Sequence, residues 1–311
     1  MKTLVNWGEE YIEHLRSRRY SKATLILMRH RFTQFTRWLM EAHRVETADE
    51  LTGELLRRWH VHITTARTQD GRPYSPRTVN GYLTATRTLI TCLAKHGCVN
   101  LLLLDNLPSV KTSKNLPGGV ISHDQARKLL SRMPIDDPRG YRNRTMLELL
   151  YSSGIRAAEL LGISMHDISF THGTVKVLGK GDKERMVPIG KTAMRFLETY
   201  LKAIRPFQLK NPAESAVFLN HYGKRIHYTM LLRIVNESMQ KAGFKDVHVT
   251  PHTFRRSCTT ELIRSGANMY HVKELLGHET LDTLKHYAKL TINDLKATHE
   301  RCHPRERDEQ R

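Results

Sequence analysis

The chain has 311 residues, of which 39% are hydrophobic and 26% charged, and its formal net charge is +19. This composition is typical of a soluble globular protein with room for two domains, and the charge favours nucleic acid as the partner. A solvated basic surface is the alternative, whereas an anionic membrane is disfavoured because the basic residues form no local cluster. No apolar run reaches membrane-spanning length and the N-terminus lacks a signal-peptide core, so we expect a cytoplasmic, nucleoid-associated protein.

The cysteines and histidines show no spacing typical of a disulfide framework or a metal site. The cysteines are Cys92, Cys98, Cys258 and Cys302, and the 18 histidines form no HExxH or Cys/His zinc pattern. We expect reduced thiols, no metal and no other cofactor.

Residues 1–105 are predicted to form a helical bundle. Apolar residues recur at helical spacing in its successive segments, with stripes at Leu4 to Leu15, Leu25 to Leu39, Leu55 to Ile63 and Val79 to Leu93. Ser75 and Pro76 are typical of the start of the last helix, and Gly97 of its end. We interpret the aromatic residues of this bundle as core residues and not as platforms for base stacking.

Residues 106–120 are predicted to be a linker, because they are polar, rich in Pro and Gly, and without periodicity. Two interpretations of Lys111 and Lys114 remain open. They either contact a DNA backbone or are simply solvated.

Residues 121–311 are predicted to form a second, α+β domain. Ser122 and Gln125 have the spacing of a capping box, and Gly154 ends a helix over residues 141–153. Three short β-rich runs separated by turn residues predict a small antiparallel sheet, and they cover residues 168–170, 174–177 and 185–189. Helices are then predicted over residues 192–204 and 228–242. The fold class is mainly α with a small antiparallel β-sheet.

Basic residues gather in the stretch from Thr250 to Tyr287. Thr250 and Pro251 are typical of a helix start, with the hydroxyl as N-cap, and the spacing of His252 and Arg255 places them on one helix face. His278 follows a Leu-Gly pair at a helix end. We interpret this stretch as a phosphate-binding site.

Two further basic residues lie upstream. Arg156 follows Gly154 at a predicted helix start, where backbone amides attract phosphate; a surface pair with Glu159 is the alternative. Lys180 lies between two glycines at the tip of a predicted hairpin, where it can act as a proton donor or phosphate contact. A solvated turn lysine is the alternative, and Lys183 is a competing candidate.

The sequence contains no carboxylate cluster for two-metal phosphoryl transfer and no Gly-rich phosphate loop. A site that cleaves DNA must then use cationic side chains to neutralise charge on the phosphate, and arginine suits this role. Tyr287 is the candidate nucleophile, because a phenol is more acidic than an alcohol and its phosphodiester is reversible. Taken alone, Tyr287 is also compatible with a core aromatic.

Five motifs, in this order, resemble those of the tyrosine recombinases, or phage integrase family, and especially its Xer-type members. They are GIRAAEL around Arg156, VLGKGDKERMVPI around Lys180, HTFRRS from His252, LLGHETLDT around His278, and HY ending at Tyr287. The resemblance covers nearly the whole chain. It implies a helical, SAM-like core-binding domain in residues 1–105 and a catalytic domain in residues 121–311 that ends in an exchange helix and tail. No arm-binding domain is expected before the bundle.

The resemblance also implies roles for the basic residues. Arg156 and Arg255 would clamp the non-bridging oxygens of the scissile phosphate, and His278 would support them with a hydrogen bond. Lys180 would be the general acid that protonates the departing 5′ oxygen.

In the same scheme Tyr287 is the nucleophile, and His252 assists removal of its proton. The attack gives a 3′-phosphotyrosyl link and a free 5′-hydroxyl, without metal or ATP. Glu159 would brace the helix of Arg156 and take no part in the chemistry.

The implied function is site-specific recombination of duplex DNA in integration, excision or resolution. The implied partners are paired DNA sites and a homotetramer, alone or with a second recombinase, with no membrane and no small-molecule substrate. The segment after Tyr287 resembles a helix that docks on a neighbouring subunit; a disordered tail is the alternative for its last residues. Two other functions remain open, namely type IB topoisomerase-like relaxation and a non-catalytic DNA-binding regulator.

Overall fold

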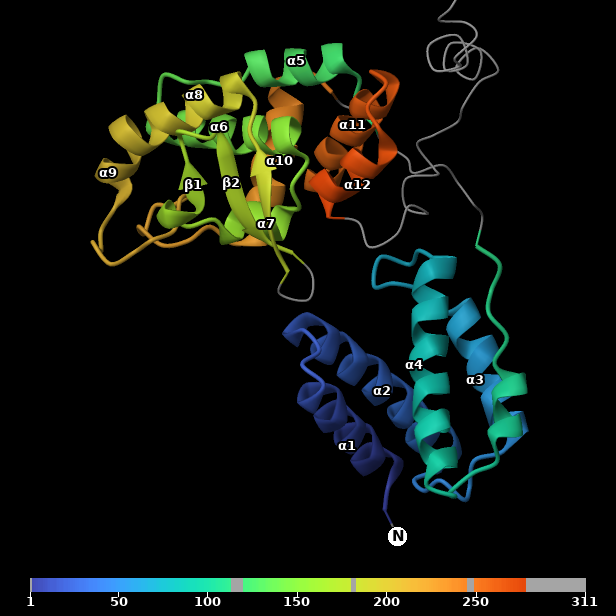
Figure 1. Cartoon of the computed structure of the whole chain (residues 1–311). Helices are drawn as coiled ribbons and strands as arrows, with labels where there is room; N and C mark the ends of the chain where they lie inside the picture. The colour runs from blue at the N-terminus through green and yellow to red at the C-terminus, as the bar shows by residue number, and fades with distance from the viewer. Residues whose placement is uncertain (1, 113–119, 180–182, 245–248, 278–311) are drawn as a thin grey trace, which may run out of the picture. The chain divides into compact units, whose positions relative to one another are not determined.

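The computed structural model of the protein describes residues 2–112, 120–179, 183–244 and 249–277 (Figure 1). The chain divides into two compact units, Met1–Lys114 and Asn115–Arg311. Each unit has a hydrophobic core of its own. None of the helices in the described part of the chain combines the length and the apolarity that crossing a bilayer requires.

The first unit is a bundle of helices. A hydroxyl side chain caps the N-terminus of each α-helix, from Thr3, Ser21, Thr52 and Ser75 in turn. The elements are α1 (Leu4–Ser17), α2 (Lys22–His43), α3 (Gly53–Thr65), α4 (Pro76–Lys95) and the 3₁₀ helix η1 (Leu101–Asn106).

Aromatic residues occupy the core of this bundle, as predicted, with the exception of Tyr20, which is 45% exposed. The rings of Phe35 and Trp59 are both buried, with centroids 5.2 Å apart. The indole of Trp59 also donates a hydrogen bond of 3.0 Å to the hydroxyl of the buried Thr86 on α4. These rings hold α2, α3 and α4 together and are not available for stacking on bases.

The chain stays attached to the bundle beyond η1. Leu107 is only 1% exposed, and its main-chain oxygen accepts a hydrogen bond from Nε of Arg87. Val110 exchanges two hydrogen bonds of 2.8 Å with the side-chain amide of Asn80 on α4. This polar segment therefore packs on the bundle, because its main-chain groups form hydrogen bonds with side chains of α4.

The second unit is built around α6 (Pro138–Ser153), which contacts helices on several sides (Figure 1). Ser122 and Gln125 form the predicted capping box at the start of α5. The other elements are α5 (His123–Ser131), α7 (Ala157–Gly162), η2 (Met165–Asp167), β1 (Ile168–Ser169), β2 (Thr174–Leu178), β3 (Glu184–Pro188), α8 (Lys191–Thr199), the π-helical segment η3 (Tyr200–Ile204), α9 (Arg205–Gln208), α10 (Tyr228–Lys241), α11 (Pro251–Arg264) and α12 (Met269–Leu276).

The three strands form an antiparallel sheet of order β1-β2-β3, which confirms the predicted fold class. Val175 pairs with Val187, and both are buried against the core of the unit. Val177 pairs with Arg185, so the same buried face of β3 carries an arginine one pleat away from Val187. This alternation directs Arg185 into the protein.

Candidate active site

Gly154 shapes the connection between α6 and α7. It lies in the left-handed region with φ of 62°, where glycine carries no steric penalty. A Cβ atom at this position would lie 2.8 Å from Cδ2 of Leu276 and 3.2 Å from the sulfur of Cys258. The turn therefore brings the end of α6 directly against α11 and α12.

Arg156 is the N-cap residue of α7, two residues after this turn. Its main-chain N–H donates a hydrogen bond of 2.8 Å to Oε2 of Glu159, and its Nη1 donates one of 2.8 Å to Oε1 of the same residue. The pair with Glu159 is present, although the carboxylate is buried and does not lie at the surface, and the side chain of Arg156 is 30% exposed.

Arg255 lies on α11 and is only 6% exposed. Its Nη1 donates a hydrogen bond of 2.8 Å to the main-chain oxygen of Gly154, and its Nη2 donates one of 2.6 Å to that of Leu276. Arg255 thus joins the end of α6 to the end of α12.

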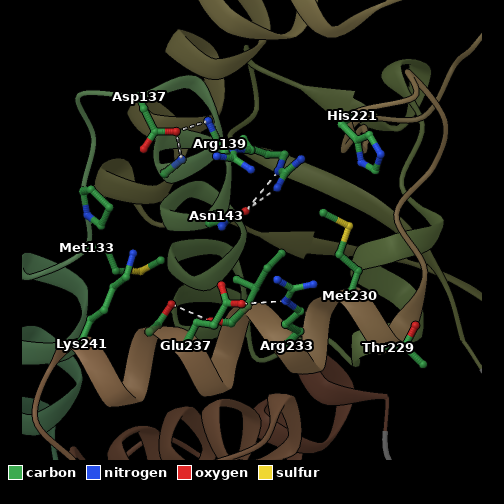
Figure 2. A pocket seen from close by; sticks show the side chains of 15 residues that line it. Met133, Asp137, Arg139, Asn143, His221, Thr229, Met230, Arg233, Glu237 and Lys241 are labelled. Carbon is green, nitrogen blue, oxygen red and sulfur yellow. Dashed lines mark hydrogen bonds and ion pairs between the residues drawn. The ribbon is translucent and has the colours of Figure 1, made fainter.

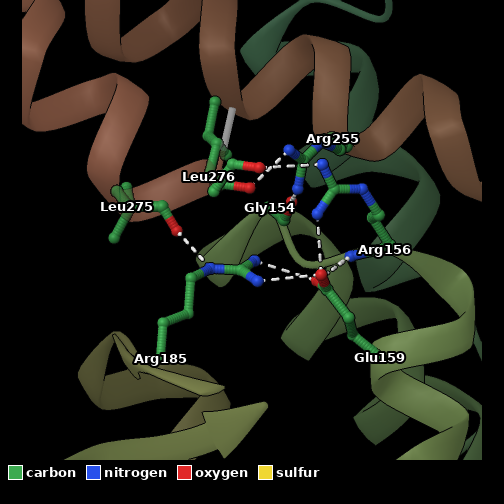
Figure 3. Close-up of polar contacts among 8 residues, drawn as sticks. Gly154, Arg156, Glu159, Arg185, Arg255, Leu275 and Leu276 are labelled. Carbon is green, nitrogen blue, oxygen red and sulfur yellow. Dashed lines mark hydrogen bonds and ion pairs between the residues drawn. The ribbon is translucent and has the colours of Figure 1, made fainter. Parts of the chain in front are cut away.

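Three arginines from three elements meet at the C-terminus of α12 (Figure 3). Arg255 binds the carbonyl of Leu276, Nη2 of Arg156 donates to that of Gly277 at 3.0 Å, and Nε of Arg185 donates to that of Leu275 at 3.1 Å. The last carbonyls of a helix have no partner within it and form the negative end of its dipole. Guanidinium groups donate hydrogen bonds to these carbonyls and also place positive charge at the negative end of the dipole.

Arg185 was not identified as a site residue from the sequence, although it lies within the hairpin motif. Its Nη1 and Nη2 donate to Oε1 and Oε2 of Glu159 at 2.8 and 2.9 Å. The available signal was the alternation of β3, which puts Arg185 on the same face as the apolar Val187. A charged residue on the buried face of a strand needs a partner inside the protein.

The charges of this cluster do not balance. Burial alone would raise the pKa of Glu159, but hydrogen bonds from Arg185 and from the main chain and side chain of Arg156 outweigh it and lower the pKa to about 2. Burial, followed by the charge of Arg156, lowers the pKa of Arg255 to about 10, so this residue stays protonated at neutral pH. The cluster contains one carboxylate, which binds Arg156 and Arg185, and a third guanidinium group on Arg255 that binds main-chain oxygens, so its net charge is positive.

His252 lies in the first turn of α11, which begins at Pro251 as predicted. Thr250 is the N-cap residue and forms a capping box with Thr253, whose hydroxyl accepts a hydrogen bond of 3.0 Å from the main-chain N–H of Thr250. His252 is exposed, and partial desolvation lowers its pKa, with further lowering by the charges of Arg255 and other nearby arginines. A neutral imidazole at pH 7 can accept a proton.

Three of the predicted site residues lie outside the described residues: Lys180, His278 and Tyr287. The structure does place Lys183, the competing hairpin lysine, which is exposed and whose main-chain oxygen accepts a hydrogen bond from Gly179 at 2.8 Å. Gly277, whose carbonyl binds Arg156, directly precedes His278 in the sequence.

A cleft of about 640 Å³ lies elsewhere in the second unit, between the first turn of α6 and one face of α10 (Figure 2). Its lining includes Asp137, which caps α6, and Arg142, which is 2% exposed. Gly154 and the arginine cluster lie at the opposite end of α6, and none of the predicted site residues lines this cleft. The cleft is separate from the candidate active site.

The model of the phage integrase family matches residues 119–293, which is more than half of the chain. The chain belongs to the phage integrase family. Its curated relatives include the tyrosine recombinase XerD of Listeria monocytogenes, 36% identical over 239 residues that cover 76% of this chain and 79% of the relative. XerD of Staphylococcus aureus strain Mu50 is 37% identical over 199 residues, which cover 64% of this chain and 67% of the relative.

Solved structures of recombinases share the fold. The Tn1549 transposon integrase in complex with a circular intermediate DNA superposes with a TM-score of 0.75, at 17% identity, over 97% of this chain and 99% of that chain. The XerH site-specific recombinase bound to its difH substrate gives a TM-score of 0.70, at 20% identity, over 93% and 82%.

The protein is a tyrosine-type site-specific recombinase that acts on DNA. This confirms the enzyme class expected from the sequence motifs. The comparisons do not favour a topoisomerase or a non-catalytic regulator.

Proposed function

We propose that Arg156 and Arg255 bind the scissile phosphate of the recombination site. The observation that carries this proposal is the meeting of their guanidinium groups at the end of α12, immediately before His278 in the sequence. Both guanidinium groups donate hydrogen bonds to main-chain carbonyls. A bound phosphate can accept these hydrogen bonds in place of the carbonyls, and the bonds to phosphate are charge-assisted. The remaining positive charge would stabilise the pentacoordinate transition state.

In the proposed reaction, the phenolic oxygen of Tyr287 attacks the phosphorus atom and loses its proton with the help of His252. The bond from phosphorus to the 5′ oxygen breaks, and Lys180 donates the proton that this oxygen takes up. A 3′-phosphotyrosyl link and a free 5′-hydroxyl result. The 5′-hydroxyl of the second DNA strand then attacks the phosphotyrosine, which restores Tyr287 and needs no ATP. His278 would add a hydrogen bond to the phosphate.

We further infer that the two units bind DNA together. Residues 1–105 would be the core-binding domain, residues 106–120 the linker and residues 121–311 the catalytic domain. Two paired sites would hold four protomers, with the segment after Tyr287 docked on a neighbour. Mass measurement of complexes with one and two sites tests this assembly: two protomers per site and four per pair are expected, and one protomer per site would contradict it.

A trapping experiment tests the chemistry. A binding sequence is first selected from a library of random duplexes, and a duplex of that sequence is nicked close to each scanned position so that the 5′-hydroxyl fragment diffuses away. We expect a covalent protein–DNA adduct that is lost in Tyr287→Phe. The matched control is Tyr270→Phe, because Tyr270 is 65% exposed on α12 and belongs to no part of the proposed site.

The outcomes separate the alternatives. An adduct that survives in Tyr287→Phe would overturn the assignment of the nucleophile. Equal adduct formation in Arg156→Lys and the unmodified protein would overturn the phosphate clamp. Relaxation of plasmids that lack the selected sequence, without joint products, would instead indicate topoisomerase activity.

A further inference from the structure

Arg185 connects three elements through a single guanidinium group (Figure 3). From β3 it binds both carboxylate oxygens of Glu159 on α7, and its Nε binds the carbonyl of Leu275 on α12. Its side chain is 15% exposed, half the exposed fraction of Arg156. Three of its five N–H groups thus donate hydrogen bonds, two to α7 and one to α12.

We propose that Arg185 is a positioning residue for the recombinase reaction, and that it keeps Arg156 available for the scissile phosphate. The proposal rests on the phosphate-binding role of Arg156 proposed above. Arg185 would act through Glu159 and through the end of α12, without touching the DNA.

Competition for Glu159 is the physical basis. Oε1 of Glu159 accepts hydrogen bonds of 2.8 Å from both Arg156 and Arg185, while Oε2 accepts from the main chain of Arg156 and from Arg185. Without Arg185, a nearly buried carboxylate would have one guanidinium partner instead of two. Glu159 would then draw Arg156 into a bidentate pair, which is the geometry that a phosphate also requires.

The end of α12 is built to admit this side chain. Gly277 has φ of 63°, and a Cβ atom there would lie 3.1 Å from Cζ, Nε and Nη1 of Arg185. A glycine at this position thus serves both the left-handed turn and the close approach of the guanidinium. Arg185 therefore packs closely beside Gly277, the residue that precedes His278.

The base of the β2–β3 hairpin lies close to the same guanidinium group. A Cβ atom at Gly179 would lie 3.4 Å from Nη1 of Arg185 and 3.7 Å from Oε1 of Glu159. Gly179 directly precedes Lys180 in the sequence. The guanidinium of Arg185 therefore lies near Gly179, which precedes Lys180, and near Gly277, which precedes His278.

Lysine cannot replace Arg185 in this role, because it offers one ammonium group where three separated N–H donors are used. The test compares Arg185→Lys with Arg205→Lys in the full-length protein. Arg205 is also buried, at 6% exposure, but its guanidinium donates to the main-chain oxygens of Ala216 and Glu214, away from the cluster. Arg205→Lys therefore reports the general cost of losing a buried arginine in the same unit.

Single-turnover adduct formation is measured on the nicked duplex and on a second duplex with a methylphosphonate at the scissile position. The methylphosphonate removes one negative charge from the phosphate, so its reaction depends less on a free Arg156. We expect Arg185→Lys to slow the phosphate reaction by about 100-fold, as misplacement of a reacting group does, and to slow the methylphosphonate reaction much less. Arg205→Lys should slow both to the same small extent.

The ratio of the two rates does not depend on how much protein is folded, because both substrates meet the same preparation. Arg185→Gln is a second variant with the same expected pattern if Arg185→Lys is insoluble. Equal slowing on both substrates, or the behaviour of Arg205→Lys, would overturn the positioning role. Arg156→Lys is measured beside these variants and should also slow the reaction of the phosphate substrate. If it does not, the proposed binding of the phosphate by Arg156 is wrong, and the role of Arg185 is wrong with it.

Discussion

The carboxylate of Glu159 binds the guanidinium of Arg156 from a side chain that is only 2% exposed to solvent. A buried carboxylate is stable only when hydrogen bonds and opposite charges replace the water that it has lost. Arg185 and the main chain of Arg156 complete this replacement. Arg156, which we propose binds the scissile phosphate, therefore belongs to an internal ion-pair network with Glu159 and Arg185.

Removal of the charge in Glu159→Gln should destabilise the second unit. The change leaves Arg156 and Arg185 without their shared counter-charge, and loss of one partner of a buried pair costs about 3 kcal/mol. Urea unfolding measures this free energy. In the control Glu198→Gln, the lost pair with Lys202 is solvent-exposed, and we expect a change below about 0.5 kcal/mol. Similar losses in both variants would show that the cluster contributes no more than a surface pair.

The contribution of Glu159 should depend on pH in a defined window. Its pKa is about 2 in the folded protein, against an ordinary value of 4.5, so folding favours the ionised form. The stability that this provides is complete above pH 4.5 and decreases as the pH falls from there towards 2. The difference in unfolding free energy between the unmodified protein and Glu159→Gln should therefore shrink below pH 4.5. A constant difference from pH 7 to pH 3 would contradict this assignment.

Local signals in the sequence predicted most of the helices. Ser75 and Pro76 start α4, and Gly154 ends α6, because capping depends on residues that are adjacent in sequence. The predicted helix over residues 192–204 is instead α8 followed by a π-helical segment from Tyr200. Apolar spacing does not separate these two helical forms over a few residues.

The arginine network was not predictable in the same way. Arg185 meets Glu159 and Leu275 through contacts that are distant in sequence, and only the packing of β3 against α7 and α12 brings them together. The six expected site residues came from motifs shared with a family, since physical reasoning alone left Tyr287 as a possible core aromatic. The basic side chains among these residues indicate a phosphate site. The contacts that Glu159 and Arg185 make around Arg156 can be seen only in the folded structure.

Arg142 offers a test of a buried charge outside the active site. Burial lowers its pKa, and its guanidinium donates to the amide oxygen of Asn143 and to the carbonyl of Leu219. In Asn143→Asp the amide oxygen becomes a carboxylate oxygen of the same shape, and a charge-assisted bond should add about 1 kcal/mol of stability. We expect the thermal midpoint of this unit to rise by about 2 to 4 °C.

The control for this gain is Asn211→Asp. The side chain of Asn211 accepts a hydrogen bond from the main chain of Ala213 in an exposed turn. No comparable increase is expected there. A rise in Asn211→Asp equal to that in Asn143→Asp would mean that the gain comes from the lower net charge of the protein and not from pairing with Arg142.

An added side chain at Gly154 would meet two separate energetic costs, one in the backbone and one in packing. Gly154→Ala puts a Cβ atom into the left-handed region and also 2.8 Å from Leu276, whose carbonyl binds Arg255. The two costs together should lower the unfolding free energy by about 2 to 4 kcal/mol. Displacement of Leu276 should also slow adduct formation.

Gly173→Ala separates the two costs. Gly173 has φ of 63°, nearly the same as Gly154, but the nearest atom to its added Cβ is the oxygen of Ile189 at 4.0 Å. This variant should lose only the conformational cost of about 1 kcal/mol and keep its rate of adduct formation. Equal losses of stability in Gly154→Ala and Gly173→Ala would show that the contact with Leu276 relaxes freely. The end of α12 would then be less rigid than its hydrogen bonds to three arginines imply.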